Sequence, residues 1–206
     1  NTASGRRWST IDDHSAPASQ LAAIVVVDRV RRRFKPPIYS TTRGGVRVWR
    51  LNVDPEEQVI IGRLLSELRS LLTSSDDDPA ATSPLLKRLF PRVYTDDEEK
   101  EAEYKRLMRE DLVASRVFQI DAVAGVLADA QGDDALTMDE GRVTALMQSL
   151  NAVRVVLGTM LDVTEDDDIG SGVEGDEHEP ERQLYGYLGW LLEWTVRSLS
   201  DSVPDG

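Results

Sequence analysis

The sequence predicts an all-α protein, a bundle of about four main helices with a small β-hairpin at its N-terminal side. In four long segments the apolar residues recur every three or four positions, which is the period of a helix with one buried face. Strict alternation of apolar and polar residues is confined to one short stretch ahead of them. Hydrophobic residues make up 40% of the chain but aromatic residues only 6%, so aliphatic side chains must fill the core.

The chain has 206 residues, which suits one compact domain, and we place that domain at residues 36–200. Residues 1–35 are predicted to form a flexible tail that contains a basic stretch. Residues 162–181 are rich in Asp, Glu and Gly, and a segment of this composition buries too little apolar surface to fold. They are predicted to be a disordered acidic loop, and residues 201–206 a short tail.

A two-stranded hairpin is predicted over residues 38–49. Gly44 and Gly45 supply the positive φ angles of a tight turn, and valine alternates with arginine directly after them. A helix should follow at once, because Asp54 is a good N-cap and Pro55 suits the first helical position. This helix is expected to end before a loop that contains three consecutive aspartates.

Three further helices are predicted after a short amphipathic turn at residues 85–90. They cover about residues 101–130, 137–161 and 184–199. The first of the three has a long apolar stripe that should face the core. The stripe contains Leu107, Met108, Leu112, Val113, Val117, Ile120, Val123, Ala124 and Leu127.

Thr137 and Glu140 have the spacing of a capping box, in which each side chain satisfies a backbone N–H near the other residue. The helix predicted over residues 137–161 should therefore begin at Thr137.

Several stretches of the chain, taken together in order, resemble one family. These stretches are residues 48–65, 84–94, 108–117, 136–161 and 184–196. No one of them is diagnostic, but their order and spacing are specific as a set. From about residue 46 to residue 200 the chain resembles the actinobacterial domain-of-unknown-function family 2017 (DUF2017), whose members are oxidative-stress-regulator-like.

The resemblance implies a helical, cytosolic and non-enzymatic protein. Genes of the family often neighbour the gene of the ClpS proteolysis adaptor, and the family has been associated with oxidative-stress regulation of transcription. This chain contains no cysteine and so departs from any form of that role that uses a thiol switch. The resemblance therefore implies a partner-binding role for this chain.

The net charge of −13 is distributed unevenly along the chain. Residues 1–50 carry ten basic and three acidic residues, a net charge of +7, and the remainder carries −20. An acidic body repels nucleic acid, so only the N-terminal part offers a basic surface. Its candidate contacts with nucleic acid or an acidic partner are Arg29, Arg31, Arg32, Arg33 and Lys35.

No catalytic motif is present, and we expect no catalytic residue, cofactor or metal. Both histidines, His14 and His178, fall in segments predicted to be loops, where no catalytic geometry is held. Asp166, Asp168 and Glu177 match three positions of an EF-hand loop, but Ser171 stands where that loop requires glycine. A carboxylate-based enzyme or a metal-binding protein is the third and least favoured reading.

Polar residues in the helical segments are expected to pair between helices. This predicted network consists of Glu110, Arg116, Asn151, Arg154 and Glu193. Aromatic residues crowd the last helix, and core packing is the first expectation for them. Tyr185, Trp190 and Trp194 are the candidates for an interface if a second aromatic face is exposed.

The sequence as a whole favours a cytoplasmic, non-enzymatic regulatory or protein-interaction protein that binds another protein or itself as a homodimer. The alternative is a regulator associated with DNA or the transcription machinery through the basic stretch, with nucleic acid less favoured than protein as the partner. No membrane association is expected, because no apolar stretch approaches the ~20 residues of a membrane span.

Overall fold

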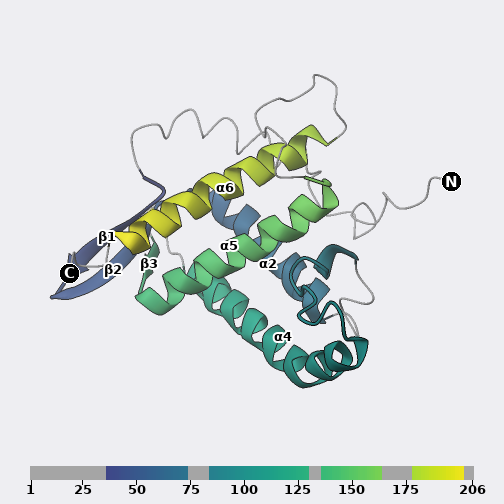
Figure 1. Ribbon diagram of the computed structural model, residues 1–206. Coiled ribbons are helices and arrows are strands. Elements are labelled where there is room, and N and C mark those ends of the chain that lie inside the picture. Colours follow the sequence, from purple (N-terminus) through teal and green to yellow (C-terminus); the bar gives the residue numbers. More distant parts are fainter. Residues whose placement is uncertain (1–35, 74–83, 130–135, 164–177, 202–206) are drawn as a thin grey trace.

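A computed structural model describes residues 36–73, 84–129, 136–163 and 178–201, and in these residues the predicted mostly α fold is confirmed. Figure 1 shows four long helices beside a small sheet. The elements in chain order are β1 (Ile38–Arg43), β2 (Val46–Leu51), α2 (Pro55–Thr73), the short 3₁₀ helix η1 (Pro84–Leu86), α4 (Glu98–Ala128), β3 (Leu136–Met138), α5 (Glu140–Met160) and α6 (Glu179–Ser200).

The hairpin forms where the sequence places it. Gly44 and Gly45 adopt φ angles of 59° and 80°, and β1 and β2 pair antiparallel around them. Strand β3, which the sequence did not predict, adds a third antiparallel strand beside β2, with Trp49 opposite Met138. The buried Trp49 also donates from its indole Nε1 to the carbonyl oxygen of Ser198 at 3.1 Å. This bond fixes the sheet to the C-terminal end of α6.

A capping box forms at the start of α2. The Glu57 amide donates to Asp54 Oδ1 at 2.8 Å, and the Asp54 amide donates to Glu57 Oε2 at 3.0 Å. The predicted N-cap at Asp54 is thus confirmed, while the capping box predicted at Thr137 and Glu140 is wrong. Thr137 belongs to β3, because pairing with β2 draws its backbone into the sheet before a helix can begin.

Other helix ends also differ from the sequence prediction. Asp139 caps α5 by accepting from the Arg142 amide at 2.8 Å, and Asp97 caps α4, which begins at Glu98, three residues ahead of the expected start. Helix α6 begins at Glu179, so the expectation of disorder up to residue 181 is wrong for its last residues. A proline in the first turn suits this early start, since the missing N–H has no partner in a helix terminus.

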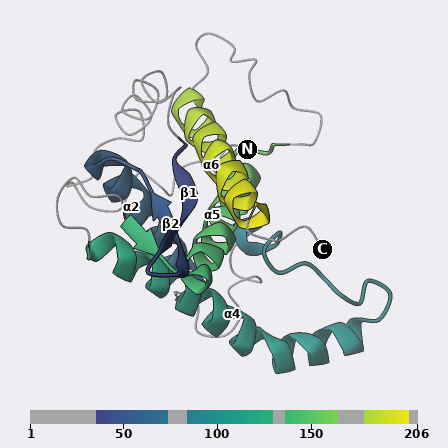
Figure 2. The ribbon, with the colours of Figure 1, turned by 90° about the vertical axis from the view of Figure 1, so that its left-hand side faces the viewer.

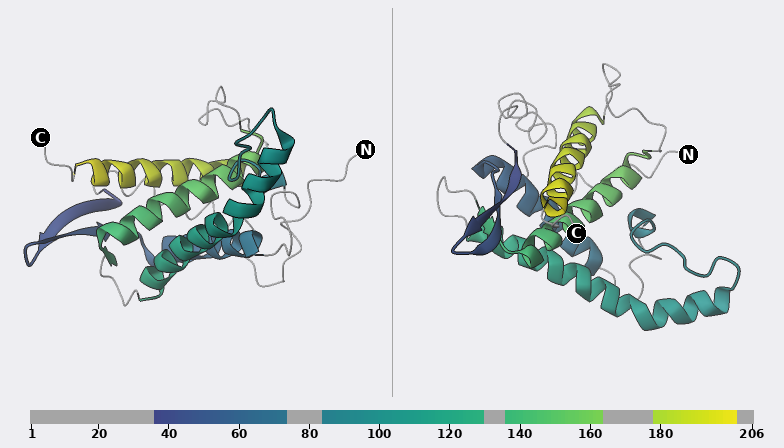
Figure 3. Two further views of the ribbon diagram at one scale, coloured as in Figure 1. Left: turned by 60° about the horizontal axis from the view of Figure 1, so that its bottom comes forward. Right: turned by 60° about the vertical axis from the view of Figure 1, so that its left-hand side comes forward.

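Helix α5 is at the centre of the bundle. It lies between α6 and α4, and α2 packs against both α4 and α5 (Figures 1 and 3). Val143 and Leu146 of α5 and Leu191 of α6 are completely buried at these contacts. Helices α5 and α6 pack closely at Gly158, where an added Cβ atom would lie 3.0 Å from a ring carbon of Tyr185. None of the helices among the described residues is long and apolar enough to cross a membrane.

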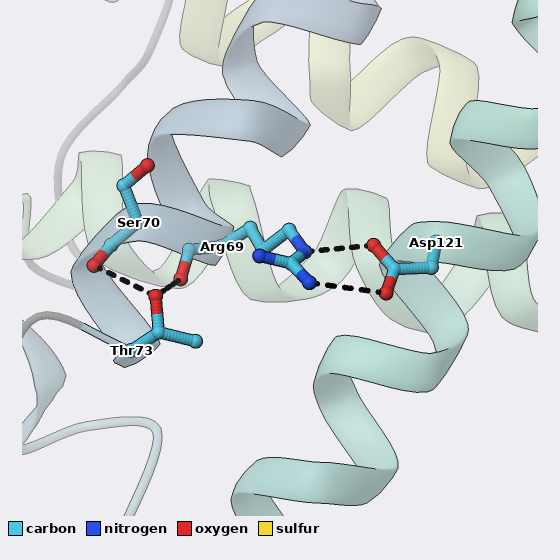
Figure 4. Close-up of polar contacts among 4 residues, drawn as sticks. All are labelled: Arg69, Ser70, Thr73 and Asp121. Atoms are coloured by element: carbon cyan, nitrogen blue, oxygen red, sulfur yellow. Dashed lines mark hydrogen bonds and ion pairs between the residues drawn. The ribbon is translucent and has the colours of Figure 1, made fainter.

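An ion pair links α2 to α4 at the surface (Figure 4). The Arg69 guanidinium donates to Asp121 through Nε to Oδ1 at 2.8 Å and through Nη2 to Oδ2 at 3.4 Å. Hydrogen bonding to Asp121 raises the pKa of Arg69 above its ordinary value. The pair lies next to Ile120, the first core residue of α4, and so marks where this helix joins the bundle.

Candidate functional site

Helix α4 extends beyond the bundle. Its 31 residues span about 46 Å, whereas the neighbouring α2 has 19 residues. Its buried hydrophobic residues are Ile120, Val123 and Val126, all in its C-terminal part. Residues 98–119, which we call the projecting half of α4, run away from the other helices (Figure 2). Among the described residues, this half is therefore covered less by the other helices than the C-terminal part of α4 is.

Large apolar side chains are concentrated on this projecting half and on the segment before it. In the described part of the chain ten large hydrophobic residues are exposed, and six of them lie between residues 93 and 118. Phe118 is 76% exposed and Leu107 57%. These two are eleven residues apart, three helical turns, so they lie on the same side of α4. The other four are Val93, Tyr94, Met108 and Leu112.

This arrangement corrects the apolar stripe predicted for α4. Ile120 and Val123 are buried and Val113 and Val117 pack partly against the core, as expected. Leu107, Met108 and Leu112 are exposed, so their assignment to the core is wrong. The periodicity of the stripe is correct, but the helix is longer than the elements that cover it.

The segment that leads into α4 is held by a buried carboxylate. Glu101 is 4% exposed, and its Oε2 accepts from the backbone amides of Tyr94 at 2.9 Å and Val93 at 3.0 Å. These bonds, with that from Tyr94 first, lower the pKa of Glu101 although burial opposes the shift. Tyr94 also meets the ring of Tyr104 edge-on, with centroids 6.1 Å apart. The projecting half is thus an ordered structure.

Two arginines of α4 lie against one phenylalanine. The guanidinium carbons of Arg109 and Arg116 are 5.3 Å and 5.5 Å from the centroid of the Phe90 ring. Arg116 Nη2 also donates to the carbonyl oxygen of Leu89 at 3.3 Å. Burial lowers the pKa of Arg116 below its ordinary value. Sequence reasoning did not identify this cluster, although the spacing of the two arginines, two helical turns, was a signal for it.

The five residues of the predicted polar network lie in separate surroundings. Arg116 contacts Leu89 and Phe90 as described, and Arg154 places its guanidinium 4.3 Å from the centre of the Tyr185 ring. The other three are exposed, and among them Glu193 pairs with the neighbouring Arg197 on α6. The structure brings none of the five together with another among the contacts it describes. Of these five residues, Glu110 and Asn151 are exposed and have no described partner.

The three predicted interface aromatics of α6 are at least partly covered. Tyr185 is buried beneath Arg154. Trp190 is half-buried, with its ring 5.9 Å from that of Tyr187, and Trp194 is half-buried beside Arg197. These surroundings are those of helix packing, and none of the three belongs to the exposed group on α4.

Several predicted sites lie outside the described residues. They are the basic stretch Arg29, Arg31, Arg32, Arg33 and Lys35, the histidine His14, and the acidic positions Asp166, Asp168 and Glu177. His178 is described: it is exposed, and its Nδ1 lies 4.0 Å from Glu181 Oε2. In the described ranges no group of three His, Asp or Glu side chains is arranged to hold a metal ion.

Comparison with protein families agrees with the resemblance seen in the sequence. The family model described as domain of unknown function (DUF2017) matches residues 31–199, which includes every helix start and strand described above. The chain belongs to the DUF2017 family. No curated protein and no solved structure matches it. The function of this DUF2017 member must therefore be argued from its own surface.

Proposed function

We propose that this DUF2017 protein is a non-enzymatic, cytoplasmic regulatory protein that binds another protein, or a second copy of itself, through the projecting half of α4. The observation that carries the proposal is the exposure of Leu107, Met108, Leu112 and Phe118 on one ordered helix half. Exposed apolar side chains gathered on a rigid element are typical of interaction sites, because covering them removes apolar area from water.

The position of these residues supports the proposal further. An apolar face that merely lacked a core partner would lower the stability of a helix end and favour fraying. Here Asp97 caps the helix by accepting from the Lys100 amide at 3.1 Å, and Glu101 ties the preceding segment to it. The resemblance to a family linked with oxidative-stress regulation is consistent with a regulatory role for such a contact.

The test compares two double variants that remove the same kind of exposed side chain. L107S/F118S alters the projecting half, and V46S/V59S removes two exposed valines from the hairpin and α2, which are 65% and 67% exposed. We expect L107S/F118S to lose a partner that is captured by wild type and by V46S/V59S, with an unchanged melting temperature. Light scattering of the same three proteins detects a homodimer, which should dissociate only in L107S/F118S.

Two results would contradict the proposal. Equal capture by all three proteins, with no self-association, would show that the projecting half is not used. Loss of capture after nuclease treatment of the lysate would instead favour the alternative, a regulator that associates with DNA through the basic stretch at residues 29–35.

A further inference from the structure

Residues 84–94, which comprise η1 and the eight residues after it, are basic in a strongly acidic protein. Residues 84–94 contain three cations, Lys87, Arg88 and Arg92, and no acidic residue, whereas the whole chain has a net charge of −13. All three side chains are exposed. Their described contacts are with backbone carbonyl oxygens: Arg88 Nη1 donates to Val163 at 3.3 Å and Arg92 Nη2 to Tyr94 at 3.5 Å. None of the three forms an ion pair among the described residues.

Helix α4 adds two further cations next to this segment. Arg109 and Arg116 lie against Phe90, and Arg116 has no acidic residue three or four positions away on its own helix. Arg116 is half-buried, and its Nε is shielded from solvent without a hydrogen-bond acceptor in the described structure. A partly desolvated guanidinium in this state gains strongly from an anion placed next to it.

On α4 itself, arginines and exposed apolar side chains are neighbours. Leu112 lies three residues after Arg109 and four before Arg116, so on the helix it stands between the two arginines, and Met108 is one turn away. Leu112 is 37% exposed and Met108 40%. A ligand that covers this region therefore meets cations and apolar side chains together.

We propose that this region binds an acidic amphipathic polypeptide segment, whose carboxylates contact Arg88, Arg92 and Arg116 and whose apolar side chains cover Met108 and Leu112. The inference rests on the proposed function, because it names the chemistry of the partner that reaches α4. A peptide is favoured over nucleic acid because residues 51–206 carry a net charge of −20, and this acidic body would repel a long polyanion that ran past the basic region.

The test uses a fluorescein-labelled peptide of about 15 residues, roughly four helical turns, made of Glu, Leu and Ala with the Leu residues on one face. Its controls are the same peptide with Gln in place of Glu and a single-stranded DNA of similar length. Binding to the full chain is measured by fluorescence anisotropy at about 50 mM and about 300 mM salt, because screening weakens contacts between exposed charges. We expect the acidic peptide to bind at least tenfold more tightly than the Gln peptide, which is about the difference that a few exposed charge pairs contribute. This difference should be smaller at the higher salt concentration.

Two charge-matched variants locate the contact. R88E/R92E should weaken binding of the acidic peptide by about tenfold or more, while R43E/R47E, the same change in charge on the exposed hairpin, should leave it unchanged. Circular dichroism confirms that both variants remain folded, and the comparison of the two peptides on wild type does not depend on any variant.

Three results would overturn the inference. Equal binding of the acidic and Gln peptides would show that the cations do not recognise carboxylates. If L107S/F118S then weakened the binding of both peptides, the proposed function of the projecting half would still stand. Equal weakening by both charge variants would show an effect of net charge alone. Tighter binding of the DNA than of the acidic peptide would identify a nucleic-acid surface instead.

Discussion

The projecting half of α4 and the rest of the helix, residues 120–128, differ in both composition and surroundings: the first is rich in charged residues and the second is mostly apolar. Both carry apolar residues at helical spacing, yet Ile120 and Val123 are buried while Leu107 and Phe118 are exposed. Helix α4 packs against α2 and α5, and within the projecting half Arg109 and Arg116 contact the segment before it at Leu89 and Phe90. The difference shows that an apolar stripe predicts which face of a helix can be buried, while the length of the neighbouring helices decides whether that face is buried.

The largest expected effect is on the free energy of unfolding, which an alanine substitution should lower in the buried part of α4 and leave nearly unchanged in the projecting half. I120A should lower the free energy of unfolding by about 2–5 kcal/mol, because it leaves a cavity in the core. F118A, two residues away on the same helix, should change it by no more than about 0.5 kcal/mol, since the ring is largely in water already. Urea unfolding followed by circular dichroism measures both. Similar losses for the two variants would mean that the projecting half is packed in solution.

A smaller, local effect is expected at the base of the projecting half. Hydrogen bonds to the Glu101 carboxylate lower its pKa below the ordinary 4.5, so this group stabilises the fold fully above its unfolded pKa. The contribution is lost as the pH falls through the lower, folded value. Below about pH 4.5 the protection of the Val93 and Tyr94 amides, relative to their intrinsic exchange rate at the same pH, should therefore fall.

The variant E101Q should reproduce this acid effect at neutral pH. Hydrogen exchange followed by mass spectrometry should show faster exchange in the segment that contains Val93 and Tyr94, while peptides from α5 remain protected. E103Q is the matched control, because Glu103 is exposed on the same helix turn. If E101Q and E103Q gave the same exchange pattern, the carboxylate of Glu101 would not hold this segment.

The smallest effect is expected at the boundary between the halves. D121N removes the exposed ion pair with Arg69, and surface pairs of this kind contribute little to stability. The melting temperature should fall only slightly at low salt and not at all near 1 M salt, where the pair is screened. A large fall that persisted in high salt would show that the pair, and not the core beyond Ile120, fixes α4 to the bundle.

Much of the fold was predictable because it depends on local signals. Gly44 and Gly45 determine the turn, Asp54 and Pro55 begin α2, and the helical periodicity identified all four long helices. Strand β3 was not predictable in this way. Three residues carry no reliable strand pattern, and only the neighbouring edge of β2 makes Leu136–Met138 extended.

The candidate site was predicted in part. Arg116 was selected as a polar residue within a helix, but its partners Leu89 and Phe90 are 27 and 26 positions away, and local sequence patterns do not report contacts over such a distance. The exposed residues Leu107, Met108 and Leu112 were recognised as apolar and assigned to the wrong environment. Periodicity describes the angle of a side chain around its helix and contains no information on where the neighbouring helices end.

The sequence by itself determined the mostly helical class, the turn and the first cap of this protein, because each follows from the conformational preferences of a few adjacent residues. The tertiary structure alone decided that α4 extends beyond the helices packed against it, and that two of its arginines lie against Phe90. It also decided that β3 forms where the sequence predicted the start of α5. These features depend on contacts between residues far apart in the chain, and such contacts form only where packing of the whole bundle brings the segments together.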